Sequence, residues 1–314
     1  MQVKPVILFV LLLIVHLAVQ GQTITWDSVR PHTTDATIEE GAYNIRHYAA
    51  KTNLDTMNAL VVFLPGTYRA PLNYLFITEQ LALMGYHVIG LMYKTNPAIN
   101  PICRDTDDET CHWRARMETV DGTDRHPTVS VNVSNSINNR LAKLLQWLIN
   151  KYPEGGWDQY YSSDEIQWSK IIVAGHSQGA SLAGVMGQAY PLKRVVMFSV
   201  MDVLDSGKIP NWVIDETKGE RYYAFFHTKD ELVSFTSAQV GWDKLGMAKY
   251  GSMANADCRT YPYNYSHILY TMYDPSTSLV DKYHNGTTLD VYINGETAYK
   301  NSLKEALRYL FRKM

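Results

Sequence analysis

The chain is poor in cysteine and carries little net charge, and each shortage excludes a class of protein. Three cysteines among 314 residues are too few for a disulfide-dense scaffold, and they lack the CxxC spacing of a structural zinc site. The 29 Lys and Arg residues are balanced by 31 Asp and Glu, a formal net charge of -2. Since no basic cluster stands out to attract a phosphate backbone, we expect no nucleic-acid partner.

Long apolar runs are scarce too, and the longest lies at the N-terminus, from Val6 to Val19 after Lys4. This run is shorter than the roughly 20 residues of a membrane-spanning helix. We therefore predict a signal peptide over residues 1–21, cleaved before Gln22, and a secreted, extracellular chain without a stable membrane anchor. An uncleaved anchor is the alternative interpretation.

Three N-x-S/T triplets are compatible with a secreted glycoprotein, at Asn132, Asn264 and Asn285. Cys103 and Cys111 lie in one polar segment, close enough in sequence to form a short disulfide in an oxidising compartment. Cys258 is then unpaired. Because nothing around Cys258 resembles an activated thiol, we expect it to be a buried small hydrophobe rather than a nucleophile.

Apolar strands alternate with helical patterns along residues 22–314, without repeats or a linker, so we expect one domain. The pattern predicts an α/β fold with a mostly parallel central sheet and helices on both faces. Ser134 is in the position of an N-terminal cap for the helix that begins at Asn135. The segment before it, residues 94–133, is expected to be irregular. The expected strands are 58–64, 86–93, 170–175, 194–198, 221–227 and 268–273, and the expected helices are 73–84, 135–149, 181–190 and 303–311.

The clearest chemical motif is Gly175-His176-Ser177-Gln178-Gly179, where the apolar strand IIVA meets a helix rich in small residues. A G-x-S-x-G turn strains the backbone of its serine, and side chains at the two flanking positions would collide, so both are glycine. The turn exposes the serine hydroxyl, and the following helix directs its N-terminal N–H groups at the charge that forms in acyl transfer. Ser177 is therefore the candidate nucleophile.

Over nearly the whole mature chain, the sequence resembles the α/β-hydrolase superfamily. Besides AGHSQGAS, it is similar to a group of uncharacterised secreted hydrolases through VVFLPGT, GYHVIGLMY, RVVMFS and HTKDELV. The resemblance implies an α/β-hydrolase fold and a catalytic triad in the chain order nucleophile, acid, histidine. It implies no particular substrate.

The order of the triad places the acid downstream of Ser177. Asp230 follows the strand that ends at His227, in HTKDELV, where the superfamily carries its carboxylate. Asp202, after the strand RVVMFS, occupies the position that some lipases use instead. We predict Asp230 as the acid that orients the imidazole, with Asp202 as the alternative.

The expected base is His284, in the polar loop DKYHNGTT between the last strand and the C-terminal helix. His267 begins the last strand and would point along the sheet. His227 precedes the expected acid by three residues and is better placed to support its loop. The sequon at Asn285 counts against His284, because a glycan beside the base would crowd the site.

The oxyanion hole requires one N–H from the residue after the nucleophile, Gln178, and one from the loop after an early strand. Leu64-Pro65-Gly66-Thr67-Tyr68 occupies that loop. We predict the Thr67 N–H as the second donor, with Tyr68 as the alternative, since Pro65 stands where lipases have histidine.

These parts predict a secreted serine hydrolase that cleaves a small-molecule carboxylic ester through an acyl-enzyme, without metal or organic cofactor. The base must be neutral, so we expect activity to fall as the pH drops through roughly 6 to 7. Loops 94–133, 202–219 and 241–266 are expected to shape an aromatic pocket for a hydrophobic group. A peptidase or amidase with the same triad, and a secreted binding protein without turnover, are the alternatives.

Overall fold

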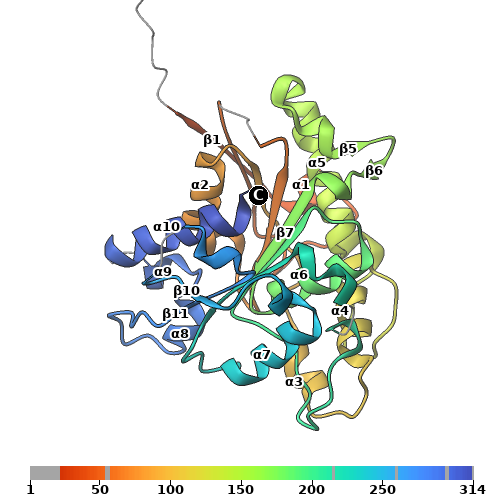
Figure 1. Cartoon of the computed structure of the whole chain (residues 1–314). Coiled ribbons are helices and arrows are strands. Elements are labelled where there is room, and N and C mark those ends of the chain that lie inside the picture. The colour runs from red at the N-terminus through yellow and green to blue at the C-terminus, as the bar shows by residue number, and fades with distance from the viewer. Residues whose placement is uncertain (1–21, 54–56, 214–215, 259–260, 294–296, 313–314) are drawn as a thin grey trace, which may run out of the picture.

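A twisted sheet runs through the middle of the molecule (Figure 1). The computed structural model describes residues 22–53, 57–213, 216–258, 261–293 and 297–312. Among these residues the sheet has nine strands, in the spatial order β1-β2-β4-β3-β7-β8-β9-β11-β10. Their bounds are β1 (Ile24–Val29), β2 (His47–Thr52), β3 (Leu60–Leu64), β4 (His87–Gly90), β7 (Ile171–His176), β8 (Arg194–Phe198), β9 (Tyr222–His227), β10 (Ala254–Asn255) and β11 (Ile268–Thr271).

The sheet is parallel except at one edge. β2 pairs antiparallel with both β1 and β4, and every pair from β4 across to β10 is parallel. Parallel strands need crossover connections, and helices provide most of them. The expected class, a mostly parallel sheet in an α/β fold, is therefore confirmed.

Longer helices cover the two faces of this sheet. They are α2 (Leu75–Leu83), α4 (Cys111–Asp121), α5 (Ile137–Lys151), α6 (Gln178–Ala189), α7 (Phe235–Lys244) and α10 (Thr297–Phe311). Shorter elements are α1 (Pro31–Thr34), α3 (Ile99–Arg104), α8 (Lys282–Asn285), α9 (Asp290–Ile293), the ribbon of β5 (Tyr161–Ser162) and β6 (Glu165–Ile166), and 3-10 turns such as η1 (Pro71–Tyr74) and η2 (Val133–Asn135).

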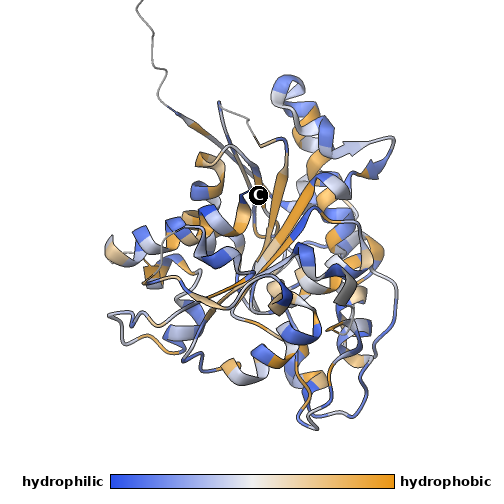
Figure 2. Cartoon of the chain, in the orientation of Figure 1, coloured by the Kyte–Doolittle hydropathy of each residue, from blue (hydrophilic) through white to orange (hydrophobic). Residues whose placement is uncertain are grey.

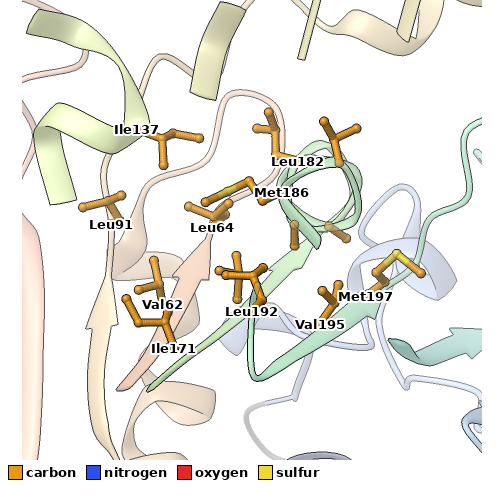
Figure 3. Close-up of a cluster of buried hydrophobic side chains, with 14 of the residues drawn as sticks. Val62, Leu64, Leu91, Ile137, Ile171, Leu182, Met186, Leu192, Val195 and Met197 are labelled. Atoms are coloured by element: carbon orange, nitrogen blue, oxygen red, sulfur yellow. The ribbon is translucent and has the colours of Figure 1, made fainter. Parts of the chain in front are cut away.

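Each face of the sheet has its own hydrophobic core, and β3 contributes to both. Val62 and Leu64 belong to the core under α4, α5, α6 and α7, whereas Val61 and Phe63 belong to the core under α2 and α10. This alternation explains why the strand is apolar at every position. Figure 2 shows the central strands as hydrophobic and the helices as mixed, and Figure 3 shows Leu64 of β3 beside Met186 of α6.

Two details of the predicted elements are wrong. The cap of α5 is Ser136, whose side chain accepts a hydrogen bond from the Asn139 N–H, because Ser134 lies inside the turn η2. The segment 94–133 is not irregular, since it contains α3 and α4. The sequence of α4 does not show the apolar spacing of a buried helix, because α4 buries the charged side chains of Arg116 and Glu118 as well as apolar ones.

The cysteines are arranged partly as expected. A disulfide joins Cys103 at the end of α3 to Cys111 at the start of α4, as predicted. Cys258 is exposed, so the prediction of a buried residue is wrong: it follows the short edge strand β10 rather than facing a core.

The predicted signal peptide, residues 1–21, lies outside the described residues. Within the described part of the chain, no helix combines the length and the apolar character needed to cross a membrane.

Candidate active site

Ser177 lies at the sharp turn between β7 and α6. Its backbone has φ 52° and ψ -122°, a conformation that costs energy for a residue with a side chain. A Cβ on Gly175 would lie 2.4 Å from the Gly179 backbone, and a Cβ on Gly179 would lie 2.1 Å from the Leu64 carbonyl oxygen. The turn therefore requires both flanking glycines. Together with the strand order, it defines the α/β-hydrolase fold.

The Ser177 side chain lines a pocket of about 390 Å³ at the carboxyl ends of the strands. Its backbone N–H donates to the Phe198 carbonyl at 2.9 Å, which fixes the turn against β8. The hydroxyl makes no hydrogen bond to another residue in the described ranges, and His284 lines the same pocket. The nucleophile candidate and the base candidate thus face one cavity.

His284 and Asp230 form a close pair at the wall of this pocket. The imidazole Nδ1 lies 2.9 and 3.0 Å from the two carboxylate oxygens, and both side chains are buried, with 3% and 0% exposure. Nδ1 donates to the carboxylate, so Nε2 carries the lone pair that a general base needs. His284 lies in the one-turn helix α8, not in the open loop expected from the polar sequence.

Backbone contacts hold each member of the pair in place. Oδ1 of Asp230 accepts the N–H groups of Leu232 and Val233, both at 2.9 Å. The neighbouring Glu231 carboxylate accepts the N–H groups of Tyr283 and His284 at 3.1 and 2.9 Å. The segment after β9 therefore holds His284 twice. Asp230 orients its imidazole, and Glu231 binds its backbone N–H.

Asp202, the alternative acid, makes its hydrogen bonds to residues other than His284 in the described ranges. Nε and Nη2 of Arg116 bind its two oxygens at 2.7 and 2.5 Å, and Ser181 and Trp212 donate to it at 2.8 and 3.0 Å. Burial alone would raise the pKa of Asp202, but the Arg116 guanidinium outweighs it and holds this pKa well below the ordinary value. Asp202 therefore fixes the buried guanidinium of Arg116 beside α6.

His176, the residue before the nucleophile, was not identified as a site residue from the sequence. Tyr74 accepts the Gly66 N–H at 3.0 Å and donates to Nδ1 of His176 at 3.1 Å. Nε2 of His176 donates to the His284 carbonyl at 3.1 Å. Burial, with the nearby His284 ring as a smaller cause, holds the pKa of His176 well below its ordinary value. The neutral ring therefore links the Gly66 loop to α8.

The two expected oxyanion donors both line the pocket. Neither the backbone N–H of Thr67 nor that of Gln178 donates a hydrogen bond to another residue within the described part of the chain. The Gln178 side chain is occupied, since it accepts from the Ile99 N–H at 2.8 Å and donates to the Thr95 carbonyl at 3.0 Å. It fixes the segment before α3 to the start of α6. The Tyr68 side chain is 75% exposed at the pocket mouth.

The pocket walls differ from the prediction. Only the first of the three expected loops contributes, through α3, α4 and the residues before them, and no described residue of 202–219 or 241–266 lines the pocket. The aromatic residues expected there are in the cores instead, as Trp242 and Tyr263 show with exposures of 0% and 1%. Apart from histidine, Tyr68 is the one aromatic residue among the described lining residues.

The other two histidine candidates are held away from Ser177. Nδ1 of His227 accepts the Lys229 N–H at 2.9 Å, and Nε2 donates to the Tyr273 carbonyl, so the residue supports the Asp230 loop. His267 stacks between Tyr223 and Tyr250, with ring centroids 4.0 and 4.3 Å away. Neither lines the pocket.

The sequon asparagines differ in exposure. Asn132 and Asn264 are exposed. Asn285 is buried, lines the pocket and donates to the Tyr292 hydroxyl at 3.4 Å. A glycan on Asn285 would disrupt this packing.

One group of metal-ligating side chains occurs among the described residues, Cys103, Cys111 and His126. Both thiols are consumed by the disulfide, and the group lies apart from Ser177.

No protein-family model matches the chain, and no curated protein sequence matches it. Among solved structures, the chain is similar to a crystal structure described as "Putative Dienelactone Hydrolase from Klebsiella pneumoniae subsp. pneumoniae MGH 78578". The two share 13% sequence identity, with a TM-score of 0.42, over 93% of this chain and 100% of that chain.

Proposed function

We propose that this protein is a secreted serine hydrolase that cleaves a carboxylic ester through an acyl-enzyme. The observation that carries the proposal is that His284, paired with the buried Asp230, lines the pocket of the strained Ser177. A solvated surface histidine would not be buried against a carboxylate that two backbone N–H groups already orient. A nucleophile and a base that face one cavity, with an acid that orients the base, are the parts of acyl transfer.

In this mechanism the Ser177 hydroxyl attacks the ester carbonyl while Nε2 of His284 takes its proton. Asp230 holds the imidazole in the correct tautomer and stabilises the imidazolium that forms. The tetrahedral intermediate collapses, and His284 returns the proton to the leaving alcohol. A water molecule, activated by the same imidazole, then attacks the acyl-enzyme and releases the acid.

The negative charge of the intermediate forms beside the Thr67 and Gln178 amides. Both amides lack an internal partner in the described part of the chain, so they are available to the oxyanion. Loss of one such donor costs about a hundredfold to a thousandfold in rate. The network from Gly66 through Tyr74 to His176 keeps the loop rigid, which this role requires.

Three features support secretion. They are the apolar N-terminal run, the Cys103–Cys111 disulfide and the exposed sequons at Asn132 and Asn264. Disulfides persist in oxidising compartments, and N-glycans are added to exposed sites there. We propose glycosylation at these two positions and exclude Asn285.

Labelling with a fluorophosphonate tests the proposal. The purified protein is expected to react at one serine per chain, and Ser177→Ala to abolish the reaction. Ser206→Ala is the matched control, because Ser206 is an exposed serine outside the pocket. Absence of labelling in the folded protein, or labelling that survives Ser177→Ala, contradicts the proposal. Turnover of 4-nitrophenyl esters against matched anilides then tests the preference for esters.

A further inference from the structure

Arg116 of α4 has an unusual environment for a guanidinium. Its side chain is 1% exposed, yet it lines the pocket of Ser177. Nε and Nη2 bind Asp202, whereas Nη1 is buried and has no hydrogen-bond partner among the described residues. Buried polar groups in folded proteins are nearly always paired, so an unpaired guanidinium N–H at a cavity marks a place for an external acceptor.

The surroundings of Arg116 hold it rigidly. Asp202 fixes two of its nitrogens in a bidentate pair, and Ser181 and Trp212 fix Asp202 in turn. The guanidinium therefore cannot rotate to pair Nη1 within the protein without breaking that pair. A donor fixed in this way suits recognition, because little side-chain entropy is lost on binding.

The charge of the pocket favours an anionic acceptor over a neutral one. Three arginines line it, Arg69, Arg104 and Arg116, and Asp281 is the sole acidic residue among the described lining residues. Arg104 is paired with Asp205 at 3.2 Å, and Arg116 with Asp202. Arg69 has no ion-pair partner in the described ranges, and the positive end of α6 adds to its field.

From these observations we infer that the substrate carries a carboxylate, bound by Nη1 of Arg116 and attracted by Arg69, while its ester carbonyl faces Ser177. The inference rests on the proposed function and names its substrate class. It replaces the expected aromatic pocket for a hydrophobic group, since Tyr68 is the one aromatic residue apart from histidine among the described lining residues. Arginine is the side chain best suited to this role, because its planar fork matches a carboxylate.

Two esters of similar length test the inference, mono-4-nitrophenyl adipate and neutral 4-nitrophenyl hexanoate. We expect kcat/KM to favour the adipate ester by about tenfold to a hundredfold, the usual effect of a hydrogen bond to a charged group. Arg69→Gln and Arg116→Lys are expected to reduce this preference about tenfold. A lysine at position 116 still pairs with Asp202 through its one nitrogen, but it has no further nitrogen in the place of Nη1 to bind the substrate. Arg114→Gln, on the same helix but outside the pocket, is the control and retains the preference.

Arg116→Lys is used only if circular dichroism shows it to be folded; otherwise Arg69→Gln and the wild-type preference decide. Equal or better turnover of the hexanoate ester by a protein that is labelled at Ser177 overturns the inference and leaves the proposed function intact.

Absence of labelling overturns the proposed function instead. Calorimetric binding of free adipate then still tests the anion site. Binding that weakens in Arg69→Gln or Arg116→Lys, but not in Arg114→Gln, supports the site, and absence of binding contradicts it.

Discussion

The two halves of the candidate site are built in different ways. The nucleophile half is local in sequence: a strand, a strained serine and a helix follow one another from Ile171 to Ala189. The acid and base half is assembled from distant segments, because Asp230 follows β9 and His284 lies in α8, 54 residues later. Local sterics fix the first half, whereas tertiary contacts fix the second.

His176 connects the two halves. It belongs to the nucleophile turn, and its ring contacts the Gly66 loop through Tyr74 and α8 through the His284 carbonyl. Substitutions at Asp230, Asp202, His267 and Glu231 distinguish the residues of the acid and base half from their neighbours.

Asp230→Asn is expected to lower kcat by about 10⁴-fold with little loss of fold, because the amide favours the wrong tautomer of the imidazole. Steady-state kinetics with a 4-nitrophenyl ester measure this effect, and a thermal melt checks the fold. A variant with near wild-type kcat would show that Asp230 does not orient the base.

Asp202→Asn is expected to act on stability instead. Removing one charge of a buried pair costs about 3 to 5 kcal/mol, because the partner remains buried and uncompensated. Arg116 is that partner. Urea unfolding measures the loss, and Asp205→Asn, at an exposed position, is the control. If Asp202→Asn lowered kcat as strongly as Asp230→Asn while keeping full stability, the assignment of the two carboxylates would be reversed.

Acid is expected to destabilise the fold through buried neutral histidines. Burial lowers the pKa of His267 to about 4, below its ordinary value of 6.5. Between pH 6.5 and 4 the imidazole is protonated in the unfolded chain but neutral in the folded chain. The contribution of this residue to the free energy of unfolding is therefore fully present above pH 6.5 and is lost as the pH drops toward 4. Urea unfolding across this range measures the slope. His267→Phe keeps the stacking with Tyr223 and Tyr250. It is expected to reduce the dependence of the free energy of unfolding on pH between 6.5 and 4. An unchanged slope in this variant would contradict this account.

Glu231→Gln is expected to have the smallest effect, a loss of about tenfold or less in kcat/KM. The amide oxygen still accepts one N–H of α8, but the charge near the start of that helix is lost, which is worth about 0.3 to 1 kcal/mol. Kinetics of the variant beside Glu305→Gln, an exposed acid in α10, measure the difference. A loss as large as that of Asp230→Asn would make Glu231 the orienting acid.

Local patterns predicted the sheet and the serine turn. The apolar runs at β3, β7 and β8 were found because a strand buried on both faces needs an apolar residue at each position, and the serine turn because its glycines have no substitute. The edge strands β1 and β10, and β2 beside β1, were not found. β1 is only partly buried and lacks such a run.

The pocket wall could not be predicted in the same way. Arg116 lies in α4, whose sequence CHWRARMETVD resembles an exposed polar segment, and only its ion pair with Asp202 allows its burial. That pair joins residues 86 positions apart. The role of His176 was missed for the same reason, since its partners Tyr74 and His284 come from opposite ends of the domain.

The most direct test of the two-part site is the pre-steady-state burst with 4-nitrophenyl acetate. If Ser177 acts with His284, the wild-type protein releases about one equivalent of nitrophenol per chain before steady turnover, and His284→Ala shows no burst while it stays folded. A burst of equal size and rate in His284→Ala would contradict the account, because the serine would then react without the imidazole from the other half.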